Sequence, residues 1–348
     1  MTLERRIPVK KAVPVILIGL AVFVFYLYFF VGIPEIISII QRVDPTFYSL
    51  AIAALLAGIF FHTLAWQYLL RPLSVKVPFK RTFLYIWVGI FFDLVVPVES
   101  VSGEISKAYL MTKDSGQETG KVVASIVSHR ILGMIITLIT LIVSSVWIVI
   151  MKYRLPVEIF NLVLFVASGT VISLIFLFLL CIEERITWKI INSVLNFAGF
   201  ISRGRFKTAS WRSKAKEALD VFRQSMGTLS KSPRSLAQPV IFTIISWFLS
   251  LFVSFFVFAA LGYQVSMTTV IIVYSISLAL QSIPVGIPAE VGIMEIIMTT
   301  LYSMFAIPIG ISAAATVLIR LLTVWLRMFV GLVAVQWIGI KAFTRNSR

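Results

Sequence analysis

The stretch PVGIPAEVGIME at residues 284–295 places two prolines, two glycines and two carboxylates inside an otherwise apolar run from residue 265 to residue 340. Proline in a helix interior removes a backbone donor and clashes with the preceding turn. A glutamate in hydrocarbon is costly unless it is paired or faces a cavity. The stretch therefore predicts a broken helix that carries two acidic groups at bilayer depth, which is a candidate functional site.

Composition indicates that this apolar run belongs to a membrane protein. The chain has 348 residues, of which 59% are hydrophobic and 13% are charged, whereas about a quarter of the residues in a typical soluble domain are charged. Apolar runs of about 20 residues are typical of membrane-spanning helices and not of the short alternating segments of an outer-membrane barrel. The predicted fold class is an all-α polytopic membrane protein.

Several kinds of site are excluded by residue counts. The single cysteine, Cys181, excludes an intramolecular disulfide, and two histidines do not suffice for a Cys/His zinc cluster. No G-x-x-x-x-G-K-[ST] loop is present, so ATP-driven transport by this chain is not expected. The formal net charge of +16 is distributed around apolar spans. We therefore expect no metal, no cofactor and no nucleic-acid partner.

Apolar segments predict about six full spans and two shorter, interrupted segments. The spans are expected at residues 14–33, 46–70, 122–151, 157–182, 238–261 and 309–341. The interrupted segments at 82–111 and 268–305 are interpreted as re-entrant hairpins, because this topology puts 24 of the 31 Lys and Arg residues on one side. Positive charge marks the cytoplasmic side. We expect a multi-pass protein of the plasma membrane with both termini in the cytoplasm.

The two halves of the chain then have the same order of elements in opposite membrane orientations. Residues 46–151 and 238–341 each contain a span, a hairpin and a long helix, within a single transmembrane domain of residues 1–348. The matching polar positions are Pro97, Gly103, Glu104 and Arg130 in the first half and Pro288, Gly292, Glu295 and Arg320 in the second. Inverted repeats with interrupted helices that meet near the midplane are typical of many transporters.

Residues 183–235 are polar and basic, and their apolar positions follow a helical spacing of three and four. The segment is predicted to be a cytoplasmic insertion of amphipathic helices. It either packs beneath the bundle or rests on the membrane surface. We expect contact with anionic lipid, because basic amphipathic helices bind such surfaces.

Four segments resemble one family of membrane proteins. VPVESVSGEISKAYLM (96–111), KVVASIVSHRILGMI (121–135), SIPVGIPAEVGIMEIIM (282–298) and LIRLLTVWLRMFVGL (318–332) are similar to motifs of the membrane domain of lysylphosphatidylglycerol synthetases and related flippase-like proteins. Ser102 stands where that family has a glycine, Lys107 where it has an arginine and His129 where it has an acid. The resemblance implies movement of an amphipathic lipid between leaflets. Because the soluble transferase domain of the synthetases is absent from this sequence, we expect no lipid aminoacylation.

The candidate substrate-binding residues are the charged side chains in and beside the interrupted segments: Glu99, Glu104, Lys107, Arg130, Glu290, Glu295, Arg320 and Arg327. The candidate helix breaks are Pro97, Gly103, Pro284, Gly286, Pro288 and Gly292. The arginines are suited to hold a lipid phosphate by charge-assisted hydrogen bonds. Arg320 and Arg327 are seven residues apart, which predicts one face of an unbroken α-helix.

The structural alternative is that pairs of the Glu104–Arg320 and Glu295–Arg130 type lock the two halves together without touching a substrate. Three functions stay open at this point: a lipid transporter or flippase, a membrane-embedded enzyme that modifies a lipid phosphate, and a secondary transporter of small solutes. We expect the first, with no catalytic residue, because no metal or nucleophile motif supports catalysis. The expected partners are a membrane lipid as substrate, and either a second copy of the chain or a separate lipid-modifying enzyme.

Overall fold

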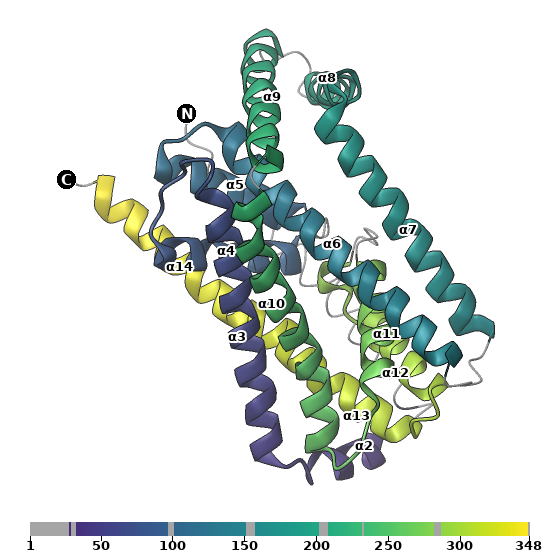
Figure 1. Ribbon diagram of the computed structural model, residues 1–348. Helices are drawn as coiled ribbons and strands as arrows, with labels where there is room; N and C mark the ends of the chain where they lie inside the picture. Colours follow the sequence, from purple (N-terminus) through teal and green to yellow (C-terminus); the bar gives the residue numbers. More distant parts are fainter. Residues whose placement is uncertain are drawn as a thin grey trace.

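The computed structural model describes residue 28 and residues 33–96, 101–150, 157–201, 208–231, 233–281 and 287–346. Every regular element within these ranges is a helix, and no strand occurs there (Figure 1), so the predicted all-α class is confirmed. Five helices are long and apolar enough to cross a membrane: Pro45–Leu70, Thr119–Trp147, Phe160–Ile182, Arg234–Ala260 and Ile309–Ile338. They match the predicted spans, apart from the one at 14–33, which lies almost wholly outside the described residues.

Helices α3 (Pro45–Leu70) and α10 (Pro233–Ala260) form the central antiparallel pair of the bundle. The Asp44 N–H at the start of α3 donates to the Ala260 carbonyl at the end of α10, with N and O 2.8 Å apart. Midway along, the Ser246 hydroxyl donates to the Gly58 carbonyl at 2.9 Å. These two hydrogen bonds join α3 and α10 at one end and near their middle.

The first hairpin consists of α4 (Phe79–Val95) and α5 (Ser102–Ser115). With 17 and 14 residues, they rise about 26 and 21 Å at 1.5 Å per residue, less than the ~30 Å hydrocarbon core. At the tip, Asp93 accepts a hydrogen bond of 2.7 Å from the Gly103 N–H. At the open end, Arg81 pairs with Asp114. These two contacts fix the helices as an antiparallel pair that starts and finishes at one end of the bundle.

The second hairpin is α11 (Met267–Gln281), the 3₁₀ turn η2 (Pro288–Glu290) and α12 (Ile293–Met304). Ala289 and Glu290 have φ values of 50° and 49°, a left-handed conformation that is uncommon for residues with a side chain. Gly292 follows at 94°, which glycine adopts readily. Regular α-helix is thus interrupted between Pro288 and Gly292, two of the positions where a break is expected, whereas Pro97, Pro284 and Gly286 lie outside the described residues.

The two hairpins start at opposite ends of the bundle and meet tip to tip. Short connections join α3 to α4 and α10 to α11, and α3 and α10 are antiparallel, so the hairpins enter from opposite ends (Figure 1). Ala289 and Val291 of the second tip pack with Leu94 near the end of α4. The interpretation of residues 46–151 and 238–341 as an inverted repeat stays a prediction, with which this arrangement agrees.

The long helix of each half follows its hairpin. In the first half this is α6 (Thr119–Ile150), which α7 (Val157–Ile182) follows back toward the other end. In the second half α13 (Ile309–Arg320) runs through a π-helical segment, η3 (Leu321–Leu326), into α14 (Arg327–Asn346). A π-helix has i→i+5 hydrogen bonds and a wider turn than an α-helix. The prediction that Arg320 and Arg327 share one helix face is therefore wrong.

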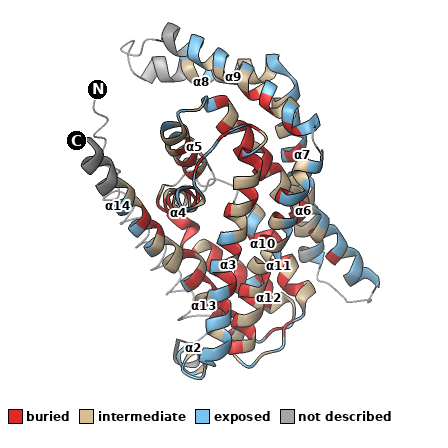
Figure 2. Ribbon diagram, turned by 60° about the vertical axis from the view of Figure 1, so that its left-hand side comes forward, coloured by how far each residue is buried: buried red, intermediate tan, exposed pale blue. Residues whose placement is uncertain are grey.

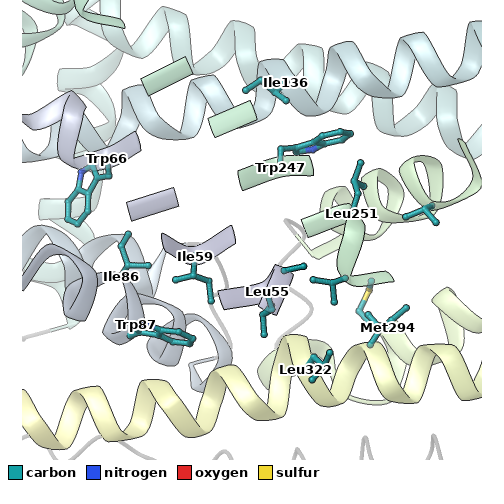
Figure 3. Packing of buried hydrophobic residues seen from close by; sticks show 14 of the residues in the cluster. Leu55, Ile59, Trp66, Ile86, Trp87, Ile136, Trp247, Leu251, Met294 and Leu322 are labelled. Atoms are coloured by element: carbon teal, nitrogen blue, oxygen red, sulfur yellow. The ribbon is translucent and has the colours of Figure 1, made fainter. Parts of the chain in front are cut away.

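Helix α14 also joins the two halves by crossing α4. The missing Cβ of Gly331 would lie 2.8 Å from Phe91 Cβ and 2.9 Å from the Trp87 carbonyl oxygen, so the two backbones are in direct contact. Figure 3 shows part of the apolar core of the bundle, to which α3, α4, α6, α10, α12 and η3 each contribute buried side chains. One continuous core therefore includes residues from both halves.

The remaining helices lie at the two ends of the bundle. The short helix α2 (Ile33–Ile40) packs on α13. At the other end, α8 (Glu184–Ile201) and α9 (Thr208–Lys231) form a largely exposed pair (Figure 2). Helix α9 buries Leu219 and Phe222 in the core and lies against α6. Helix α9 thus packs on the end of the bundle, and both the cytoplasmic location of the segment and its contact with anionic lipid stay predictions.

The close approach at the first hairpin tip gives a test of this packing. A Cβ at Gly103 would lie 2.2 Å from Asp93 Oδ2 and 2.4 Å from the Gly89 carbonyl oxygen. We expect Gly103→Ala to lower the free energy of unfolding by about 1–3 kcal/mol, as overpacking does, measured as a fall in melting temperature in detergent. Gly133→Ala is the matched control, because nothing lies within 4 Å of its Cβ position. Equal melting temperatures for the two variants would contradict the hairpin geometry.

Candidate functional site

Arg320, the last residue of α13, ties the broken segment to the long helix. Its Nε donates a hydrogen bond of 2.7 Å to Glu295 Oε1, and its Nη2 donates to the Ala289 carbonyl. The second carboxylate oxygen of Glu295 accepts the Gly292 N–H at 2.7 Å. Arg320 and Glu295 are only 3% and 4% exposed. The side chains of both therefore satisfy backbone groups that the break leaves without helical partners.

The ion pairs differ from those that the structural alternative proposed. Glu104 Oε2 lies 2.9 Å from Lys107 Nζ, one turn further along α5, and Glu295 pairs with Arg320. The proposed Glu104–Arg320 pair is therefore wrong, and the ion pair shown for Glu295 is not with Arg130. Side chains three residues apart on a helix are neighbours, so α5 itself supplies the partner of Glu104. Glu104 and Lys107 both belong to the first half of the chain, and Glu295 and Arg320 both belong to the second.

The other predicted site residues lie in different parts of the structure. Arg130 is partly buried on α6, directly after His129, and Glu290 is buried in the left-handed turn at the second hairpin tip. Glu99 lies outside the described residues. Asp93 near the end of α4 accepts hydrogen bonds from the Gly103 N–H and the Ser102 hydroxyl at the start of α5.

A second group of polar side chains, here called the cationic cluster, consists of His62, Lys107, His129 and Arg327. The rings of His62 on α3 and His129 on α6 are in contact, with their centroids 4.3 Å apart. The charges of Lys107 and Arg327 both act on the His62 ring. The cluster therefore gathers side chains from α3, α5, α6 and α14, of which α14 belongs to the second half and packs on α4 of the first.

Lys107 is held inside the bundle by small and aromatic neighbours. The side chain is 9% exposed, and its aliphatic carbons lie 2.9 Å from the position that a Cβ of Gly89 would occupy. Its ammonium group lies 5.7 Å from the centre of the Trp66 ring. A cation over an indole ring is stabilised by the quadrupole of the ring. The glycine in α4 thus makes room for a buried lysine, whose ammonium group faces the tryptophan in α3.

Arg327 is a cation of the cluster for which no ion pair is found in the described part of the chain. Its Nε is fully buried and has no hydrogen-bond acceptor among the described residues, although the residue as a whole keeps some exposed surface. Tyr274 of α11 lies within electrostatic range of the guanidinium group. Burying a charge without a partner is costly. Arg327 is therefore a candidate binding group for an anion that comes from outside the chain.

Sequence reasoning missed His62. The signal was present, because a histidine within an apolar span deserves a functional hypothesis, but its partner became visible only when α3 and α6 were placed side by side. In the part of the chain that the structure describes, no group of three or more His, Cys, Asp or Glu side chains is arranged to hold a metal ion.

These features define a polytopic helical membrane protein with interrupted helices and buried charges at their meeting point. The sequence matches the family described as the lysylphosphatidylglycerol synthase TM region over residues 16–331, and the chain belongs to that family. The resemblance seen in the four motif segments is thereby confirmed.

Relatives of the chain include three archaeal proteins that are described as UPF0104 membrane proteins. The one from Pyrococcus horikoshii is 25% identical over 327 residues, which cover 92% of this chain and 95% of the relative. One from Methanothermobacter thermautotrophicus is 24% identical, with 89% of this chain and 90% of the relative covered. One from Methanocaldococcus jannaschii is 24% identical, with 86% and 87% covered.

The buried ion pair of the second hairpin predicts a large coupling between its two residues. Arg320→Ala leaves Glu295 buried without its cation, so we expect a loss of about 3–5 kcal/mol in stability. The double variant Arg320→Met, Glu295→Met should lose less than the sum of the two single variants, since no buried charge remains. Melting temperatures in detergent measure both effects.

Arg223→Ala is the control for this experiment, because it removes an exposed pair with Glu184. Exposed pairs contribute about 0–1 kcal/mol, so its melting temperature should stay near that of the unchanged protein. Additive losses for Arg320 and Glu295 would show that the two side chains do not interact.

Proposed function

We propose that the protein is a flippase-like lipid transporter that moves an amphipathic phospho- or polyprenyl-type lipid between leaflets. The phosphate of the lipid is held by the cationic cluster. The observation that carries the proposal is the buried Arg327 Nε, which has no acceptor among the described residues, in a cluster that also contains the buried Lys107.

The charge of the site supports an anionic ligand. Glu295 neutralises the charge of Arg320, and Glu104 neutralises the charge of Lys107. No ion pair of Arg327 is found in the described part of the chain. Arg327 is therefore the cation of the cluster with which a phosphodiester, carrying one negative charge, would pair. Arginine presents a planar set of donors that matches two phosphate oxygens at once. Of the predicted binding residues, Arg327 and Lys107 are thus assigned to substrate and Arg320 and Glu295 to the support of the hairpin.

The arrangement of the helices supports transport. Irregular backbone at bilayer depth is tolerated where it is buried in protein or lines a cavity. Two hairpins from opposite ends that meet at Leu94 and Ala289 place two such breaks together, as in transporters that alternate access around a central site. We also propose that the protein lies in the plasma membrane, with both termini and helices α8 and α9 on the cytoplasmic side. We propose no catalytic activity for it.

We favour a lipid over a small solute because a helix that contributes to the cluster also exposes apolar side chains further along its length. Helix α6, which carries His129 inside the bundle, exposes Ile139, Val143 and Trp147 on its outer side. The acyl chains of a lipid have apolar surface to lie against while the headgroup reaches the cluster from the same helix. A lipid-exchange assay distinguishes this function from both alternatives, the membrane-embedded enzyme and the small-solute transporter.

Transbilayer exchange of a fluorescent phosphatidylglycerol in proteoliposomes tests the proposal directly. We expect the protein to accelerate exchange over empty liposomes, and Arg327→Ala to slow it about tenfold or more, since a hydrogen bond to a charged group contributes about 1.5–3 kcal/mol. Arg42→Ala is the matched control, because Arg42 is exposed and lies outside the cluster.

If protein and empty liposomes exchange every lipid tried at one rate, the transporter proposal fails. Chemical conversion of the lipid during the assay would instead support the enzyme, and uptake of a soluble anion with no lipid exchange would support a small-solute transporter.

Labelling of single cysteines tests the opposite orientation of the hairpins. In a Cys181→Ser background, Glu118→Cys lies beyond the first hairpin and Ile309→Cys beyond the second, and both positions are exposed. A membrane-impermeant maleimide added to sealed vesicles of one orientation should label only one of the two. Labelling of both sites from one side would contradict the inverted topology.

A further inference from the structure

The rings of His62 and His129 are in contact, but no hydrogen bond between them is found in the described part of the chain. The two rings lie 4.3 Å apart, centroid to centroid, and join α3 to α6 at the cationic cluster. His129 is only 6% exposed, and its Nε2 is buried without a hydrogen-bond partner in the described part of the chain. Most buried polar atoms in proteins have a partner. A buried ring nitrogen without one is a candidate site for a ligand that arrives during function.

The charges that face the histidine pair come from every side of the cluster. Lys107 of α5 acts on both rings, and Arg327 of α14 acts on His62. The remaining titratable or charged groups nearby are Glu104 on α5, Asp93 on α4, Arg130 on α6 and Tyr274 on α11. While the cluster holds no anion, Lys107 and Arg327 repel a further positive charge on the rings. An anion bound to the same two cations reverses that repulsion.

We infer that the His62–His129 pair is a proton-binding site that fills when an anionic phosphate occupies the cationic cluster. The inference rests on the proposed function and gives it a coupling ion. A neutral imidazole nitrogen of the pair accepts one proton from water, and the resulting imidazolium donates an N–H to a phosphate oxygen. When the lipid leaves, the proton returns to water, so each cycle moves one proton with one phosphate.

The consequence for affinity follows from linkage. If the complex holds one proton more than the free protein, lipid affinity rises as the pH falls, by up to about tenfold per pH unit. The rise ends at the pH where the free protein also holds the proton. Because binding and protonation are reciprocal, a proton gradient across the membrane would also bias the direction of lipid movement.

Proton uptake can be counted by isothermal titration calorimetry of the full chain in detergent. The probe is a short-chain phosphatidylglycerol, whose phosphodiester does not titrate between pH 6 and pH 8. Titrations in two buffers of different ionisation enthalpy give the number of protons bound with each lipid. We expect between about one half and one proton at pH 7, and a rise in affinity of about three- to tenfold from pH 8 to pH 7.

Two variants distinguish the acceptor of the proton. The double variant His62→Gln, His129→Gln should bind the lipid with no proton uptake and with an affinity that does not change with pH. The single variant His129→Asn removes the ring whose Nε2 has no partner, and it should lower the proton uptake with less disturbance of α3. Glu104→Gln should retain the uptake, and loss of uptake in Glu104→Gln but not in the histidine variants would overturn the assignment.

The failures of the two proposals are distinct in this experiment. Lipid binding by the unchanged protein with no difference between buffers would overturn the proton site and leave the lipid site standing. An absence of lipid binding at every pH would overturn both.

Discussion

The ion pair between Arg320 and Glu295 is the constraint on which the second half of the structure depends. A helix that breaks inside a membrane leaves backbone donors and acceptors that water cannot reach. Arg320 donates to the Ala289 carbonyl, and Glu295 accepts from the Gly292 N–H. Each member of the pair therefore also supplies a hydrogen-bond partner to a backbone group at the break. This holds the hairpin tip where it meets α4, and with it the junction of the two halves.

The π-helical segment explains why two arginines in one helix have different environments. In an unbroken α-helix, Arg320 and Arg327 would face the same neighbours. The segment Leu321–Leu326 widens the turn between them, so that Arg320 reaches Glu295 while Arg327 lies in the cluster with His62. One cation is thereby fixed to the scaffold, and the other is left for an anion. Departures from α-helical geometry are frequent at functional sites.

The spans and the break at Pro288 and Gly292 could be predicted from the sequence, because their signals are local. Length and apolarity determine a span, and proline, glycine and acid in an apolar run indicate a break. The partners of the charges could not be predicted, since Glu104 and Lys107 or Glu295 and Arg320 are chosen by packing. The π segment was missed because a spacing argument assumes a uniform helix. The role proposed for His62 could not be predicted either, because it depends on the contact with His129 between helices α3 and α6.

The central claim is that the cationic cluster binds a lipid phosphate through Arg327. Native mass spectrometry of the purified protein, with and without Arg327→Ala, tests this claim most directly. The account predicts that a phosphate-containing lipid is retained by the unchanged protein and is lost, or strongly reduced, in the variant, with both proteins equally folded. Equal retention of the same lipid by both proteins, or no retained lipid in either, would contradict it.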